Sequence, residues 1–122
     1  TRLDKALITC ELNHYIMNSP LTGVLSRARG VRSFGCTTRA LSMVATGILD
    51  AHFDLRHRLT PENFLAPSLI ISEAGGLLTD PDGNPLPDIQ NLTEKYSILA
   101  SATSELHESL IKQIKGECIY EQ

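Results

Sequence analysis

The amino-acid sequence predicts a layered α/β/α domain over residues 1–122, with a mixed sheet of about five strands flanked by helices. Short apolar runs that contain β-branched residues alternate with longer amphipathic segments, which is typical of layered α/β domains. The length fits one hydrophobic core. Hydrophobic residues make up 42% and charged residues 20%, a balance that excludes a disordered chain, a collagen and a coiled coil.

The first half of the chain contains the signals of two strand–helix pairs. We expect a strand at residues 6–12, a helix at 21–29, a strand at 31–34 and a helix from 37 to 46. Thr37 or Thr38 is suited to cap the second helix, because a hydroxyl can accept a hydrogen bond from a backbone amide at a helix start. Gly47 can supply the left-handed residue that ends this helix.

The second half continues the alternation. A strand is expected at residues 48–54, and its two faces carry Leu49, Ala51 and Phe53 on one side and Asp50, His52 and Asp54 on the other. Thr60-Pro61 is a favourable start for a helix that runs to residue 74 and ends at Gly75-Gly76. A strand at 77–79, a turn at 80–83, a polar loop to 94, a strand at 97–101 and a helix capped by Thr103 complete the pattern.

Charge and cysteine content narrow the expected partners and compartment. Residues 27–58 hold six arginines against two aspartates, a net charge of +4 within a chain of net charge −3. Such a segment can attract a phosphate or an acidic partner. It lacks the interleaved aromatic and basic residues of nucleic-acid-binding modules, so no nucleic acid is expected.

The three cysteines form no close pair, which favours free thiols in a reducing cytoplasm. No apolar run approaches the roughly 20 residues of a membrane span, so no membrane partner is expected.

Two residue patterns have both a chemical and a structural interpretation. Cys36 precedes a predicted helix, where thiols can be reactive, but a catalytic cysteine needs a histidine partner that the sequence does not place. We favour a structural Cys36. His52, Asp54 and His57 could in principle hold a metal ion, but such a site needs a full ligand set and supporting hydrogen bonds. We favour surface or pocket-rim positions for these three residues.

Four segments, in order, resemble the inositol monophosphatase family. Residues 30–38 (GVRSFGCTT) resemble its G-[IV]-R-x-x-G-[ST]-[AC]-A stretch, and residues 41–53 (LSMVATGILDAHF) its L-x-x-V-A-x-G-x-x-D-A-Y helix and strand. Residues 73–80 (EAGGLLTD) match E-A-G-G-x-[LV]-[TS]-D, and residues 98–101 (ILAS) resemble the terminal [IV]-[LI]-A-[SA]-N strand. The similarity covers nearly the whole chain with familiar spacing.

This resemblance implies Mg²⁺-dependent hydrolysis of phosphomonoesters of inositol or similar small molecules. Family members place their metals between two domains, and the amino-terminal domain brings an acidic pair and an Asp-Pro-x-Asp-Gly motif. That motif is missing here, so the chain resembles the carboxy-terminal domain alone, with the amino-terminal metal-binding domain absent. A first residue other than Met agrees with this interpretation. We therefore expect the isolated chain to be inactive.

The resemblance also marks site positions. Gly35, Cys36, Thr37 and Asp54 correspond to residues that contact the substrate in relatives. Asn63 stands where the family has an aspartate metal ligand, so we expect a weakened Mg²⁺ ligand there, since Mg²⁺ prefers anionic oxygen. Glu62 lies one residue away, on a different helix face. Pro67 cannot donate a helix hydrogen bond to Asn63, which predicts a kink or a later helix start.

Two functions remain open at this point. The first is the substrate-side domain of a phosphomonoesterase with a small phosphorylated substrate. The second is a binding or regulatory domain of the same fold whose metal site has degenerated, as the Asn63 position suggests. The expected partners are the missing amino-terminal domain and, less strongly, a second copy of the chain, because an uncovered apolar face can drive self-association.

Overall fold

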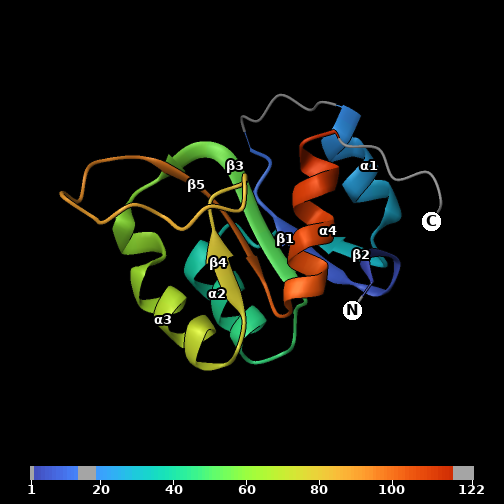
Figure 1. Cartoon of the computed structure of the whole chain (residues 1–122), viewed down its shortest axis with the longest axis horizontal. Helices are drawn as coiled ribbons and strands as arrows, with labels where there is room; N and C mark the ends of the chain where they lie inside the picture. The colour runs from blue at the N-terminus through green and yellow to red at the C-terminus, as the bar shows by residue number, and fades with distance from the viewer. Residues whose placement is uncertain (1, 14–18, 117–122) are drawn as a thin grey trace.

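A computed structural model describes residues 2–13 and 19–116 of the chain. It contains one mixed five-stranded sheet of order β2-β1-β3-β5-β4 (Figure 1). Strand β1 runs parallel to β2 and β3, whereas β5 runs antiparallel to β3 and β4. The strands are β1 (Leu7–Cys10), β2 (Gly30–Arg32), β3 (Ala51–Leu59), β4 (Leu77–Thr79) and β5 (Tyr96–Ser101).

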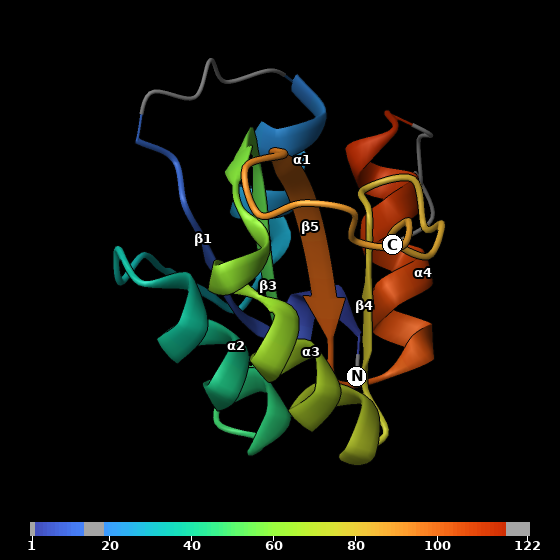
Figure 2. The same ribbon diagram turned by 90° about the vertical axis from the view of Figure 1, so that its left-hand side faces the viewer.

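Helices cover both faces of the sheet, which confirms the predicted α/β/α layering (Figure 2). Helices α1 (Ser19–Arg27) and α4 (Ser104–Ile114) pack together on one face, and α2 (Thr37–Ala45) and α3 (Leu65–Glu73) on the other. Two short 3₁₀ turns, η1 (Leu3–Lys5) and η2 (Pro61–Asn63), precede β1 and α3. None of the helices in the described residues is long and apolar enough to cross a membrane.

Each helical layer covers its own hydrophobic cluster. The cluster beneath α1 and α4 includes Ile8, Phe53, Leu99 and Leu110. The cluster beneath α2 and α3 includes Leu41, Phe64 and Ile98. In the second cluster, Phe64 meets Tyr96 edge to face, with ring centroids 5.5 Å apart. Burial on both faces of the sheet follows from the alternating direction of side chains along each strand.

Strand β3 differs from its predicted range of 48–54. It begins at Ala51, because Ile48 and Leu49 donate backbone hydrogen bonds to the Met43 carbonyl and complete the turn after α2. It continues to Leu59, which pairs with Tyr96 across a register shift that follows Asp54. His57 lies in this irregular stretch with φ of 59°. The extension depends on pairing with β5, a partner distant in the sequence, so local pattern does not reveal it.

The third helix begins later than Thr60, as the position of Pro67 allowed. Thr60 and Pro61 open η2, and α3 starts only at Leu65. Pro67 therefore falls in the first turn of α3, where its missing N–H breaks no hydrogen bond within that helix. At the other end, Gly75 has φ of 89°, and Gly76 donates a backbone hydrogen bond to Ile71 at 2.9 Å. These two glycines end the helix as predicted.

The predicted threonine cap of α2 is wrong. Cys36 occupies the N-cap position, and its side chain makes no capping hydrogen bond. Thr37 is the first helical residue and is buried, and the hydroxyl of Thr38 donates instead to the backbone carbonyl of Asn63 at 3.1 Å. The cap of α4 is confirmed, since the hydroxyl of Thr103 accepts from the backbone amide of Leu106 at 3.2 Å.

Candidate functional site

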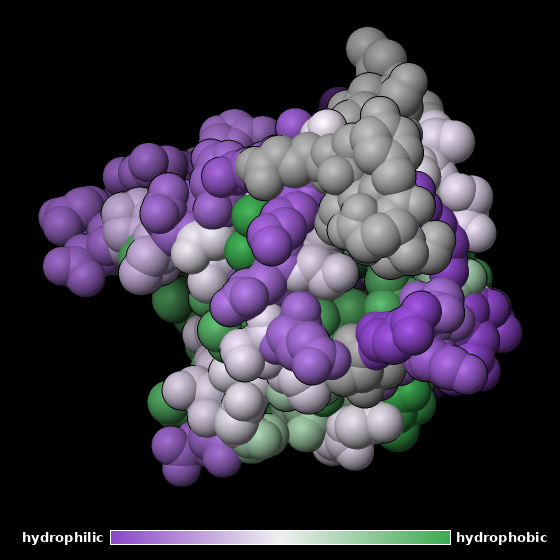
Figure 3. Space-filling model, turned by 45° about the vertical axis from the view of Figure 1, so that its right-hand side comes forward, coloured by the Kyte–Doolittle hydropathy of each residue, from purple (hydrophilic) through white to green (hydrophobic). Residues whose placement is uncertain are grey.

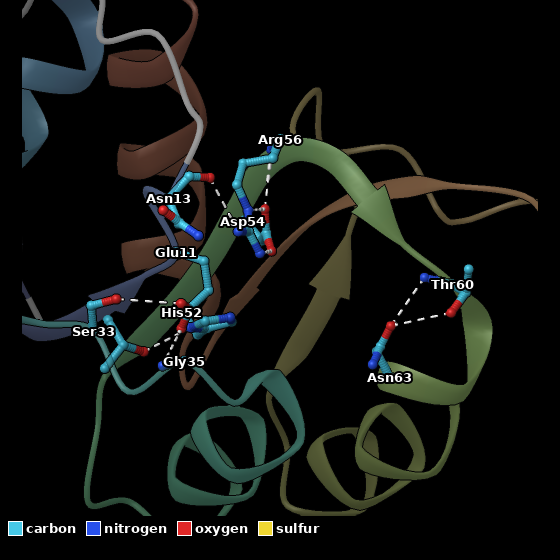
Figure 4. A network of polar contacts seen from close by, with 10 residues as sticks. Glu11, Asn13, Ser33, Gly35, His52, Asp54, Arg56, Thr60 and Asn63 are labelled. Carbon is cyan, nitrogen blue, oxygen red and sulfur yellow. Dashed lines mark hydrogen bonds and ion pairs between the residues drawn. The ribbon is translucent and has the colours of Figure 1, made fainter.

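A row of buried polar side chains lies at the carboxyl end of β1 and in the first half of β3, beside the start of α2 (Figure 4). Phe53 of β3 pairs with Leu99 in the cluster beneath α1 and α4, so His52 and Asp54 face the opposite layer. Thr9 pairs with His52 across the strands, and Glu11 follows on the same side. All four polar side chains have exposed fractions of 6% or less. We call Thr9, Glu11, His52 and Asp54 the polar row.

Asp54 is fully buried and is held by Arg56. Its Oδ1 accepts from Nε of Arg56 at 2.9 Å and its Oδ2 from Nη2 at 2.7 Å, while the Arg56 backbone amide also donates to Oδ1. This hydrogen bonding raises the pKa of Arg56, so the guanidinium stays charged. The Arg56 side chain is 16% exposed, so in this structure the guanidinium covers the predicted substrate residue Asp54.

His52 is neutral in the fold. Burial lowers its pKa to about 4, against a smaller opposing effect of the nearby Asp54 carboxylate. Its Nδ1 lies 2.8 Å from the hydroxyl of Thr9, whereas its Nε2 has no hydrogen-bond partner in the described part of the chain. A neutral, enclosed imidazole is poorly suited to exchange protons with bulk solvent near pH 7.

Sequence reasoning did not assign a role to Glu11. Its Oε1 accepts from the hydroxyl of Ser33 at 3.3 Å, and its Oε2 from the backbone amide of Gly35 at 3.2 Å. The available signal was an acidic residue within the otherwise apolar segment predicted as a strand at residues 6–12. The partners lie more than 20 residues away, so the sequence alone did not show that this carboxylate is buried and bonded.

The predicted substrate residues Gly35, Cys36 and Thr37 lie at the start of α2, next to the polar row. Gly35 is exposed with φ of 70°, and Cys36 is an exposed free thiol. Thr37 is buried, with 7% of its surface exposed, at the first position of α2. The first amides of a helix lack intrahelical partners, and Cys36 supplies none with its side chain. These amides can donate hydrogen bonds to oxygen atoms of a ligand.

Asn63 lies apart from the polar row and is engaged in a local structure (Figure 4). Its Oδ1 accepts from the backbone amide of Thr60 at 3.1 Å and from the Thr60 hydroxyl at 3.3 Å. The backbone bond engages one lone pair of this oxygen, whereas the single hydroxyl proton of Thr60 is shared with a second acceptor. The neighbouring carboxylate of Glu62 accepts from the same hydroxyl. Asn63 therefore acts here as part of a capping box at the start of η2.

These donors do not fit a complete Mg²⁺ site. Within residues 2–13 and 19–116, no group of three or more His, Cys, Asp and Glu side chains is placed to hold a metal ion. That absence includes His52, Asp54 and His57, considered from the sequence as a possible metal cluster. Mg²⁺ favours anionic oxygens, and Asn63 supplies a neutral oxygen that already accepts a hydrogen bond from the Thr60 backbone. Asn63 as a weakened metal ligand stays a prediction.

The described cysteines show no catalytic arrangement. Burial, followed by the charges of Glu11 and Asp54, raises the pKa of Cys10 to about 12, so its thiol stays protonated. Cys36 is exposed, and the described residues place no histidine in contact with it. Cys118 lies outside the described residues. The structural interpretation of these thiols therefore remains the favoured one.

The profile of one protein family, described as the inositol monophosphatase family, matches residues 9–117. The chain belongs to the inositol monophosphatase family. It is 34% identical over 95 residues to a fructose-1,6-bisphosphatase/inositol-1-monophosphatase of Thermococcus kodakarensis, covering 78% of this chain and 37% of that protein. It is 32% identical over 101 residues to the inositol-1-monophosphatase of Bacillus subtilis, covering 83% and 36%.

Solved structures support the same fold. A Pyrococcus horikoshii protein described as similar to inositol-1 monophosphatase superposes with a TM-score of 0.78 at 30% identity, over 90% of this chain and 42% of that one. The chain thus spans little more than a third of the length of the curated relatives. The family is generally Mg²⁺-dependent, and its recognition from the four sequence segments is confirmed.

Proposed function

We propose that this chain is the substrate-side domain of a phosphomonoesterase that acts on inositol monophosphate or a similar small phosphorylated molecule in the cytoplasm. The observation that carries the proposal is the start of α2, where helix amides without a side-chain cap lie beside the polar row. Membership of the family and the names of the relatives from Thermococcus and Bacillus support this chemistry. The free Cys10 and Cys36 suit a reducing compartment.

In this proposal the chain binds and orients the substrate. Gly35 shapes the turn whose amide is held by Glu11, the following amides of Cys36 and Thr37 donate to substrate hydroxyl oxygens, and the Asp54–Arg56 pair lies nearby on the sheet. The metal ligands belong to an amino-terminal half, because the described residues supply no metal cluster. The 122-residue chain alone is then expected to release no phosphate from inositol 1-phosphate in excess Mg²⁺.

Two measurements on the purified chain test the proposal. Phosphate release is assayed with inositol 1-phosphate and Mg²⁺, and clear turnover would contradict the division of labour between two halves. In parallel, ¹H–¹⁵N spectra are recorded during titration with inositol 1-phosphate. We expect shifts confined to Gly35, Cys36, Thr37 and the neighbouring Arg56. Shifts elsewhere, or none at millimolar ligand, contradict the substrate assignment.

The outer face of α3 supports the proposed partner. Leu65, Leu69 and Ile70 are 42%, 66% and 51% exposed, so this helix is apolar outside as well as inside. By contrast, the exposed residues of α4 are all hydrophilic, among them Glu105, Glu108 and Lys112. The face of the molecule in Figure 3 mixes hydrophilic and hydrophobic side chains. We assign the α3 face to the amino-terminal half, since the curated relatives are more than twice as long as the matched segment.

Co-expression of the chain with its amino-terminal half tests this interface. Leu69→Asp should abolish co-purification of the two halves, because a charge would be buried at the contact. Leu92→Asp is the matched control, since Leu92 is 60% exposed but lies in the loop before β5. Equal effects of the two variants would contradict the assignment. Sedimentation of the chain alone decides the alternative occupant, a second copy, which predicts a dimer that Leu69→Asp dissociates.

The second candidate function is a metal-degenerate binding or regulatory domain of the same fold. The observation that favours it is the capping box, in which the Asn63 oxygen accepts from the backbone amide of Thr60 and is thereby engaged in local structure. The test is Asn63→Asp in the chain joined to its amino-terminal half. A gain of phosphatase activity by orders of magnitude supports degeneration at this position, and unchanged activity contradicts it.

A further inference from the structure

Glu11 is a buried carboxylate at the junction between the sheet and the start of α2. It directly follows β1, and its backbone amide donates to the Phe53 carbonyl at 3.3 Å, which extends the β1–β3 pairing by one residue. Its side chain is 6% exposed and lies beside His52 and Asp54 (Figure 4). A carboxylate in such a position is stable only when its oxygens are hydrogen-bonded, which makes its partners informative.

Both partners of Glu11 belong to the exposed loop that leads into α2. One oxygen accepts from the Ser33 hydroxyl, and the other from the Gly35 backbone amide. Ser33, Phe34, Gly35 and Cys36 are all exposed, so packing contributes little to their placement. Gly35 has φ of 70°, a conformation that defines the direction in which the chain enters the helix. The two bonds to Glu11 therefore tie this turn to the rigid sheet.

We infer that Glu11 is a positioning residue that holds the Gly35 amide and thereby fixes the following amides of Cys36 and Thr37 for substrate oxygens. This inference rests on the proposed function of these residues. Glu11 acts from behind the loop, through Gly35 and Ser33, and does not itself touch the ligand. Its negative charge suits the electropositive amino end of α2. The guanidinium of Arg56 is paired with Asp54, so the hydrogen bonds from the loop are the direct stabilisation of the Glu11 carboxylate.

Glu11→Gln is the central test, because it keeps the shape while replacing one acceptor oxygen with a donor group. We expect amide hydrogen exchange at Gly35 and Cys36 to accelerate by roughly tenfold or more, with β5 amides unchanged, because a charge-assisted hydrogen bond is lost. The dissociation constant for inositol 1-phosphate, read from the same spectra, should rise by a similar factor. Glu73→Gln, at an exposed position of α3, is the matched control.

A second variant covers the possibility that Glu11→Gln disturbs folding. Ser33→Ala removes one of the two loop bonds from an exposed position, and should produce a smaller change in the same two readouts. If Glu11→Gln binds inositol 1-phosphate as tightly as the wild-type chain does, the positioning role is overturned, but the proposed function stands. Absence of binding by the wild-type chain overturns both, which distinguishes the two failures. Faster exchange without weaker binding would show a structural role only, and also overturns the inference.

Discussion

The two faces of the sheet differ in what they bury, although the same strands supply both. The face beneath α1 and α4 buries an apolar cluster that continues from Ile8 through Phe53 to Leu110. The face beneath α2 and α3 combines a smaller apolar cluster with the polar row at one end. Within strand β3, Phe53 lies on the face beneath α1 and α4, whereas His52 and Asp54 lie on the face beneath α2 and α3. Stability and a candidate binding site are thus separated across the thickness of one sheet.

Truncation of the apolar face should have the largest effect on stability. Phe53 is 2% exposed, and Phe53→Ala should lower the free energy of unfolding by about 4 kcal/mol, because it removes buried surface and leaves a cavity. The matched control is Leu69→Ala on the outer side of α3, where 66% exposure predicts a change within about 0.5 kcal/mol. Urea denaturation of both variants measures the difference, and similar losses would contradict the contrast between the two positions.

Breaking the charged pair should be nearly as costly on the polar face. Arg56→Met leaves the fully buried Asp54 carboxylate without its counter-charge, so we expect a loss of about 3 kcal/mol. The control is Asp4→Asn, which removes an exposed pair with Arg2 and should have an effect below about 0.5 kcal/mol. Urea denaturation should show a larger loss of unfolding free energy for Arg56→Met than for Asp4→Asn. The reverse order would rule out a stabilising role of the buried pair.

Acidification should destabilise the fold, and His52 on the polar face should contribute a large share of that loss. The pKa of folded His52 is about 4, below its usual 6.5, so the unfolded chain binds its proton first as the pH falls. The contribution of neutral His52 is complete above pH 6.5 and is lost as the pH falls toward 4, by about 2 to 3 kcal/mol. Burial also lowers the pKa of His107, which adds to the slope in the same direction.

His52→Phe isolates the share of His52 in this pH dependence. The variant retains a buried ring and removes the titrating group, so its unfolding free energy should change less between pH 7 and pH 5 than that of the wild type. It also removes the Nε2 atom that is buried without a partner in the described residues, which offsets part of the loss of the Thr9 contact. An unchanged slope would place the acid sensitivity elsewhere.

Local signals in the sequence predicted most of the fold. The alternating segments gave the five strands, the layering and the helix that Thr103 caps, and the two glycines after Glu73 marked the end of α3. Helix α3 starts later than the predicted Thr60, because Pro67 cannot take part in a regular helix that begins there. The extension of β3 was missed because its last pair, Leu59 with Tyr96, joins residues far apart in the chain.

The candidate site was less accessible to sequence reasoning. Residues 35–37 and Asp54 were found through resemblance, and the structure brings both to the end of the sheet where the polar row lies. Glu11 was missed because its burial results from a loop that follows it by more than 20 residues. The close engagement of Asp54 by Arg56 was also missed, since the register of β3 decides on which side the two residues meet.

The smallest expected effect concerns the junction of α2 with α3. Pro67 has no N–H for the Asn63 carbonyl, and the Thr38 hydroxyl donates to that carbonyl instead. Thr38→Val should therefore cost about 1 kcal/mol in the wild-type background, as one hydrogen bond is lost. In the Pro67→Ala background the cost should fall toward zero, because the restored amide of residue 67 can donate to the same oxygen. A double-mutant cycle by urea denaturation measures this coupling, and equal costs in both backgrounds would mean that Thr38 does not substitute for the missing helix donor.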